Sequence, residues 1–261
     1  MSIDIKLITK LRELTGAGIA DCKSALEESG GDIDKAIEAL RKKGALKAAK
    51  KSERATNEGV IAIRQEGNKA AVVGVAAETD FVARNEDFIK AIDEFAQKLS
   101  AVGEEDFRSW AEEKIRNELI VKLGENIQLV IAEILEGGVV GIYLHSNKKL
   151  GAAVILNGGN VKLASELAMQ VTAMAPIYIK PEDVPTEELE KETEIYRERL
   201  KAEGKPEEMW DKIIAGKLEK YYQEVCLLNQ AFIKDDKLSI EQLIKQSGDN
   251  VSVVKFSRYA I

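Results

Sequence analysis

The chain has 261 residues, of which 45% are hydrophobic and 32% charged, and its formal net charge is −7 at pH 7. This balance is typical of a globular protein with more than one domain and is too apolar for a disordered chain. The negative charge argues against a general nucleic-acid binder, because such proteins gain affinity by neutralising phosphates. We therefore predict a protein partner or a small ligand, with no direct binding of nucleic acid.

Cysteine content and hydropathy indicate the compartment. Cys22 and Cys226 lie too far apart in sequence for a CxxC metal pair, and two cysteines give no disulfide framework. No apolar run approaches the ~20 residues that a membrane-spanning helix requires. The N-terminal segment is an amphipathic helix with an acid at Asp4, which a signal peptide would not have. These features predict a cytoplasmic protein without a membrane partner.

Residues 1–54 are predicted to form a three-helix domain followed by a basic linker. Apolar residues recur at helical spacing in three stretches, which Thr15–Gly18 and Ser29–Gly31 separate and which end before Gly44. Seven basic residues then fall between positions 41 and 54: Arg41, Lys42, Lys43, Lys47, Lys50, Lys51 and Arg54. They indicate a contact with an acidic or phosphate-bearing partner or, more simply, a solvated helix end and linker.

Alternating hydrophobicity then predicts two related α+β core subdomains with antiparallel strands. The first covers residues 55–137 and the second begins at residue 138. In each, a β-hairpin is followed by a helix, which suggests a repeated unit. The strands expected from alternation are residues 58–65, 69–78, 127–135, 139–145 and 150–156. The helices expected from helical spacing are residues 86–100, 104–123 and 161–173.

An antiparallel helical hairpin, a coiled-coil arm, is predicted as an insertion in the second subdomain. Residues 184–226 carry two apolar seams of coiled-coil spacing, which Gly204–Pro206 separates. Such an arm either protrudes and finds a partner or packs flat on its own core. The second subdomain then comprises residues 138–183 and 227–261, and a last strand at 251–259 returns to its sheet. The predicted fold class is α+β.

The sequence offers no clear catalytic or metal-binding constellation. His145 is the one histidine, and zinc-site, P-loop and nucleophile-elbow motifs are absent. We expect His145 to have a structural or contact role, because catalysis would require an orienting partner. Glu78 and Asp80 could be an acid and base pair, but alternate acids on an extended segment are a weak signal. The prediction is no enzyme, no metal and no cofactor.

The stretch ETDFVARN, residues 78–85, is the most unusual feature. It places Phe81 directly beside Asp80, where a strand ends and a turn should begin. Phe81 is either a core residue that caps the hairpin or an exposed wedge that enters a cleft of another protein. The two interpretations differ in one observable, which is the exposure of the Phe81 side chain.

Four motifs, in order, resemble the signatures of bacterial elongation factor Ts, the nucleotide exchange factor family of the GTPase elongation factor Tu. They are LRELTGAGIADCKSALEESGGDIDKAIEALRKKGALKAAKK at 11–51, TDFV at 79–82, KLGENI at 122–127 and YLHSNKKLGA at 143–152. The resemblance implies a translation elongation factor that binds elongation factor Tu in its GDP form. It would accelerate GDP release by displacing Mg²⁺ and distorting the nucleotide site, which allows GTP to bind.

The resemblance also implies roles for individual residues. Those expected to displace Mg²⁺ from the GTPase are Thr79, Asp80, Phe81 and Val82. Further partner contacts are expected at Arg12, Ile19, Ala20 and His145. Some relatives have methionines in place of Ile19 and Ala20, so the docking surface there is expected to be smaller. The arm would mediate self-association, while contacts of a terminal helical module found in longer relatives are not carried over to this chain.

Three other hypotheses predict different observations. A hydrolase that uses Glu78 and Asp80 requires a deep pocket around those acids, whereas a wedge requires a convex, exposed Phe81. A plain scaffold binds its partner without accelerating nucleotide release. An RNA-binding role for residues 41–54 predicts a steep salt dependence of binding.

Overall fold

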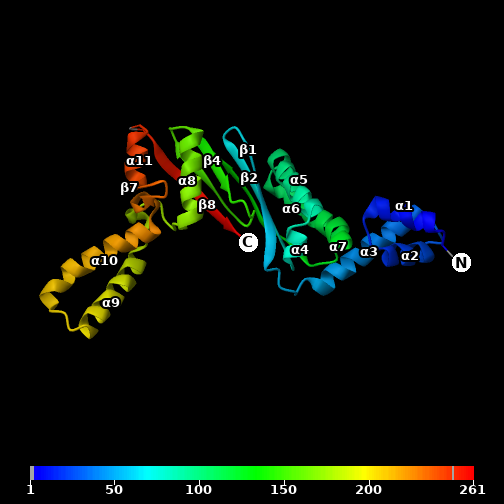
Figure 1. The fold of residues 1–261 in the computed structure, drawn as a ribbon, viewed down its shortest axis with the longest axis horizontal. Helices are drawn as coiled ribbons and strands as arrows, with labels where there is room; N and C mark the ends of the chain where they lie inside the picture. Colours follow the sequence, from blue (N-terminus) through cyan, green and yellow to red (C-terminus); the bar gives the residue numbers. More distant parts are fainter. Residues whose placement is uncertain (1–2, 249) are drawn as a thin grey trace. The chain divides into compact units, whose positions relative to one another are not determined.

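The computed structural model describes residues 3–248 and 250–261, with the backbone alone described for residues 45–50. The side chains of Lys47 and Lys50, in the basic stretch, therefore lie outside the described part. The chain divides into two compact units (Figure 1). Unit 1 comprises Met1–Ile134, Ser146–Leu150 and Tyr259–Ile261, and unit 2 comprises Leu135–His145 and Gly151–Arg258.

Unit 1 begins with the three predicted helices. They are α1 (Ile5–Thr15), α2 (Ile19–Glu28) and α3 (Ile33–Lys51). The side chains of Asp4 and Asp32 accept hydrogen bonds from backbone N–H groups in the first turns of α1 and α3. Gly16 ends α1 in a left-handed conformation with φ of 67°. The helices pack around a small core of Leu11, Ala17, Cys22, Ala25, Leu26, Ala36 and Leu40.

Gly44 does not end the third helix, as the sequence suggested, but lies inside α3. A Cβ atom at this position would lie 2.4 Å from Cγ2 of Val121 and 3.2 Å from the carbonyl oxygen of Arg116. The missing side chain therefore lets α3 approach the helical segment that carries those residues. Close packing, and not a helix stop, explains this glycine.

The sheet of unit 1 has the order β1-β2-β3 and contains the predicted hairpin. Its strands are β1 (Glu58–Glu66), β2 (Lys69–Ala77) and β3 (Ile127–Glu136). Glu66 pairs with Lys69 around Gly67, whose φ of 60° suits a two-residue turn. Strand β2 is buried from its second residue to its last, and α5 (Glu86–Val102) packs against both strands of the hairpin.

The helix predicted over residues 104–123 is interrupted by one wider turn. It consists of α6 (Glu104–Lys114), a π-helical turn at Ile115–Leu119 and α7 (Ile120–Leu123). Phe95 of α5 meets Phe107 and Trp110 of α6 edge to face, with ring centroids 6.0 and 5.2 Å apart. These aromatic contacts anchor α6 to the core of unit 1.

The sheet of unit 2 repeats the pattern of the first, with the order β4-β5-β8. Its strands are β4 (Val139–Leu144), β5 (Leu150–Asn157) and β8 (Ser252–Ala260). The predicted return of the last strand is confirmed, since β8 pairs beside β5. Helix α8 (Val161–Met174) packs against β4 (Figure 1). A hairpin followed by a helix therefore occurs twice, and the α+β class is confirmed.

Two antiparallel helices, α9 (Thr186–Ala202) and α10 (Trp210–Val225), form the predicted hairpin between α8 and β8. They pack on each other and extend away from the sheet of unit 2 (Figure 1), so the alternative that they lie flat on the core is wrong. At their base the carboxylate of Glu188 accepts hydrogen bonds from the hydroxyls of Tyr178, at 2.6 Å, and Tyr221.

Shorter elements complete unit 2. A two-stranded sheet of β6 (Ala231–Phe232) and β7 (Asp235–Ser239) is followed by α11 (Ile240–Gln246), and short 3-10 turns occur at Pro181–Asp183, Glu207–Met209 and Leu227–Asn229. Among the helices of residues 3–248 and 250–261, none combines the length and the apolar character needed to cross a membrane.

Candidate functional site

Residues 80–83 form a one-turn helix where the sequence suggested a simple turn. Two residues separate the end of β2 from helix α4 (Asp80–Ala83). Thr79 is its N-cap, and its hydroxyl accepts a hydrogen bond from the backbone N–H of Val82 at 3.5 Å. Asp80 forms an ion pair with Arg84, one turn later, at 3.3 Å. We call residues 79–83 the Phe81 turn.

The Phe81 side chain faces solvent, with 83% of its surface exposed. A phenylalanine this exposed is unusual, because most are buried. Its neighbours Val82 and Ala83 are buried in the core of unit 1. The alternative that Phe81 is a core residue capping the hairpin is therefore wrong. Two residues of the turn anchor it, and one presents an aromatic ring.

Two carboxylates hold the strand end that precedes the Phe81 turn. Glu125 accepts hydrogen bonds from the backbone N–H groups of Glu78 and Thr79, both at 3.1 Å, and from the Thr79 hydroxyl at 2.5 Å. Glu78 in turn accepts from the backbone N–H of Asn126 at 2.6 Å and from the guanidinium of Arg54 at 3.3 Å. Each segment thus satisfies the backbone donors of the other.

The environments of Glu78 and Asp80 do not suit an acid and base pair. The hydrogen bond from the Asn126 N–H, followed by the interaction with Arg54, holds the pKa of Glu78 below its ordinary value. Asp80 lines a cavity of about 470 Å³ together with the start of β1 and residues 146–149, but Glu78 does not line it. The shared pocket that a hydrolase requires therefore does not enclose both acids.

The lowered pKa of Glu78 predicts an effect of pH on stability. A carboxylate whose pKa is lower in the folded state stabilises the fold above its unfolded pKa, ~4.3, and loses that contribution as pH falls through the folded value. We expect Glu78→Gln to lower the free energy of unfolding by on the order of 1 kcal/mol at neutral pH and to approach the wild type below pH ~4. Urea unfolding at both pH values measures this, and a pH-independent difference would contradict it.

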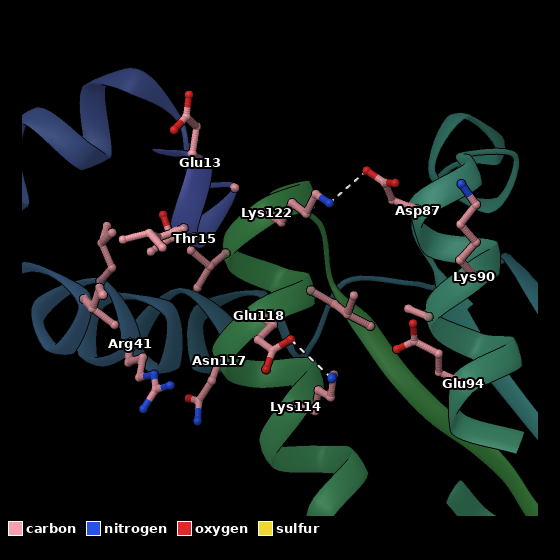
Figure 2. A pocket seen from close by; sticks show the side chains of 17 residues that line it. Glu13, Thr15, Arg41, Asp87, Lys90, Glu94, Lys114, Asn117, Glu118 and Lys122 are labelled. Atoms are coloured by element: carbon pink, nitrogen blue, oxygen red, sulfur yellow. Dashed lines mark hydrogen bonds and ion pairs between the residues drawn. The ribbon is translucent and has the colours of Figure 1, made fainter. Parts of the chain in front are cut away.

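A cleft of about 580 Å³ lies in unit 1 between the N-terminal helices and α5 to α7 (Figure 2). Lys122 pairs with Asp87 at 2.8 Å and Lys114 with Glu118 at 3.6 Å. The charged side chains that line the cleft are four acids and four bases: Glu13, Asp87, Glu94, Glu118, Arg41, Lys90, Lys114 and Lys122. This balance does not select an ionic ligand of either sign. No cluster of three or more potential metal ligands occurs among the residues that the structure describes.

The other expected contact residues lie on the surfaces of both units. Arg12 is exposed near the end of α1, and Ile19 and Ala20 are exposed at the start of α2. Ile19, at 58% exposure, is a large apolar side chain without a core role. His145 is exposed directly after β4 and belongs to unit 2. The structure therefore groups Thr79 to Val82 in one turn and places Arg12, Ile19 and Ala20 on the helices of the same unit.

Sequence reasoning did not identify the residues that support the Phe81 turn. Asn126 is only 2% exposed, and its side-chain amide donates to the carbonyl oxygen of Arg54 at 2.8 Å. A buried asparagine is uncommon and needs such partners. The available signal was the polar pair Glu125-Asn126 directly after Gly124, whose left-handed conformation ends α7.

Comparison with known proteins identifies the protein class of this chain. The family model described as "Elongation factor TS" matches residues 78–261. The chain is similar over 99% of its length to "Elongation factor Ts" of Chlorobium phaeobacteroides, at 44% identity and 98% coverage of that protein. It is also similar over its full length to the proteins of the same name from Aquifex aeolicus, at 41% identity, and Teredinibacter turnerae, at 40%, covering 98% and 91% of them.

These matches and the α+β fold define a translation elongation factor. The chain belongs to the elongation factor Ts family.

Proposed function

We propose that this protein binds the GTPase elongation factor Tu in its GDP form and accelerates GDP release, so that GTP can bind. The observation that carries the proposal is the 83% exposure of Phe81 on a turn whose adjacent residues are buried or hydrogen-bonded. An aromatic side chain held in this way enters a partner's cleft without first reorganising its own fold.

Displacement of the partner's Mg²⁺ explains how binding alone releases the nucleotide. A GTPase holds GDP through a phosphate loop and through Mg²⁺ bound at the phosphate oxygens. In our proposal Phe81 separates the elements that position this ion, while Asp80 acts on the polar groups around it. By linkage, GDP weakens the complex by the same factor by which the complex weakens GDP binding. The protein then makes and breaks no covalent bond, and it acts in the cytoplasm, where translation occurs.

The energy available from Phe81 sets the need for other contacts. Burial of one phenylalanine contributes roughly 1.5–3 kcal/mol, which corresponds to about ten- to a hundredfold in an equilibrium constant. Greater acceleration requires binding energy from elsewhere in the interface. We assign this role to Arg12, Ile19, Ala20 and His145, whose side chains are exposed. Of the other two expected contact residues, Thr79 caps the turn and Val82 is buried beneath it, so they support Phe81 and do not supply contact area of their own.

We propose that the domains divide these two roles, docking on the partner and presentation of Phe81. Residues 1–54 would dock on the partner, and residues 55–137 would carry the Phe81 turn. Residues 138–183 and 227–261 would form the second contact region around His145. The arm at 184–226 is a candidate coiled-coil surface for self-association, supported by the exposed apolar side chains of Ile195 and Met209 on its helices and tip.

The decisive experiment is stopped-flow release of a fluorescent GDP analogue from the host's own elongation factor Tu. We expect release to accelerate with increasing concentration of this protein and then to saturate. A protein that binds the GTPase without accelerating release would be a scaffold. Binding to RNA with a steep salt dependence would instead favour the nucleic-acid hypothesis.

Arg12→Ala is expected to weaken the complex roughly tenfold while leaving the maximal release rate near that of the wild type, because a peripheral charge contributes to association and not to the wedge. Titration of the variant against the GTPase gives both parameters. Lys10→Ala is the matched control, since Lys10 is an exposed base on the same helix. A reduced maximal rate at unchanged affinity would contradict the docking role of Arg12.

A further inference from the structure

The side chain of Glu125 accepts hydrogen bonds on both carboxylate oxygens, and all of the donors belong to residues 78 and 79. One oxygen accepts from the backbone N–H groups of Glu78 and Thr79, and the other accepts from the Thr79 hydroxyl. The two segments are separated by more than forty residues in sequence, so no local motif creates this contact. Glu125 therefore fixes the point at which β2 ends and the Phe81 turn begins.

The Phe81 turn cannot hold its own shape. Helix α4 has four residues, and a single helical turn is unstable in isolation because nucleation fixes several dihedral angles for one hydrogen bond. Val82 and Ala83 anchor the turn from below through their burial. Within the turn itself, two hydrogen bonds to Thr79 hold its start: the side-chain cap, which is long at 3.5 Å, and the bond from the Ala83 N–H to the Thr79 carbonyl oxygen at 3.2 Å. The orientation of the residues that precede Phe81 thus depends on what holds Thr79.

Glu125 orients the Thr79 cap as well as its backbone. A hydroxyl has one proton to donate and lone pairs that accept. Because the Thr79 proton is directed to Glu125, a lone pair of the same oxygen is left facing the N–H of Val82, as the cap requires. Replacement of Glu125 would free the hydroxyl to rotate and would leave the two backbone donors of Glu78 and Thr79 without this acceptor.

The loop of Glu125 also connects the turn to the end of α3. The side-chain amide of Asn126 donates to the carbonyl oxygen of Arg54, and its backbone N–H donates to the Glu78 carboxylate. The Nζ of Lys51 donates to the carbonyl oxygen of Gly124. Residues 124–126 therefore join the last turn of α3 and the segment after it to the segment that presents Phe81.

From this geometry we propose that Glu125 is a positioning residue for nucleotide exchange, which keeps the Phe81 turn in the conformation that enters the GTPase. This proposal rests on the proposed function. It predicts that loss of the Glu125 carboxylate lowers the maximal exchange rate more than it lowers the affinity for the GTPase. If only a fraction of the molecules holds the turn correctly, the effective rate falls to that fraction of its full value. Affinity changes less, because the docking helices supply binding energy independently of the turn.

Exchange kinetics of full-length variants test the proposal. We expect Glu125→Ala to lower the maximal rate of GDP-analogue release roughly tenfold, the size expected for loss of a helix cap with its supporting hydrogen bonds. Glu125→Gln keeps one acceptor oxygen and should be intermediate. Glu188→Ala is the matched control, because Glu188 also accepts several hydrogen bonds but lies in unit 2 at the base of the arm. It should retain the wild-type maximal rate.

Combination with Phe81→Ala separates positioning from a general loss of stability. If Glu125 acts through Phe81, Glu125→Ala should have little further effect on the rate in a Phe81→Ala background. Deuterium exchange of the peptide that covers residues 78–84 should also rise in Glu125→Ala without the partner present. Additive losses, or unchanged deuterium exchange, would overturn the positioning role while leaving the exchange function intact. If the wild-type protein does not accelerate GDP release from the GTPase, both proposals are overturned.

Discussion

Phe81→Ala is expected to slow GDP release at saturating protein by about ten- to a hundredfold, which is the factor that burial of one phenylalanine supplies. Binding to elongation factor Tu should weaken by less. The physical reason is that a wedge gives its energy where the partner is distorted, whereas the docking surfaces bind both the distorted and the undistorted partner. Stopped-flow release over a titration of the variant gives the two parameters separately.

The fold itself should not respond to this substitution. Phe81 is 83% exposed, so its truncation removes few contacts within unit 1, and the midpoint of thermal unfolding should stay within about 2 °C of the wild type. Phe107→Ala is the contrasting control, because Phe107 is fully buried and its loss should cost about 3–5 kcal/mol. Equal losses of affinity and maximal rate for Phe81→Ala would contradict the wedge.

The sequence predicted those parts of the fold whose signals are local. Two short apolar stretches, now β1 and β2, with Gly67 between them were enough to place the hairpin, because a tight turn between two such stretches is a local signal. The return of β8 to the sheet of unit 2 followed from the little chain left after the arm. Gly44 was misplaced as a helix end, because its reason is a contact with Val121 from a distant segment.

The candidate site was harder to predict, because exposure depends on contacts across the sequence. Local chemistry left Phe81 open to both a core and a surface position. Phe81 is exposed because Val82 and Ala83 are buried on the opposite side of the turn and because Glu125 holds the start of the turn. Likewise, Glu78 and Asp80 are neighbouring acids that the sequence does not distinguish. In the structure, Glu78 accepts a hydrogen bond from Asn126, whereas Asp80 forms an ion pair with Arg84.

Gly141→Ala is expected to destabilise unit 2 more than an ordinary small substitution does. A Cβ at Gly141 would lie 2.2 Å from the carbonyl carbon of Ala164 and 2.3 Å from the backbone nitrogen of Ser165. Both atoms belong to the backbone of α8, so no side-chain rotation relieves the clash, and β4 must separate from the helix. We expect a loss of about 3 kcal/mol or more, seen as a lower urea midpoint with little change in the denaturant slope.

Gly216→Ala provides the matched control, with the opposite sign. Gly216 lies inside α10, and a Cβ there would meet no atom within 4 Å. Alanine has the higher helix propensity, so this variant should gain about 0.5–1 kcal/mol. The same chemical change thus tests two environments, one closed by helix backbone and one open. If the Gly141→Ala protein is as stable as the wild type, β4 and α8 do not approach each other as closely as the structure indicates.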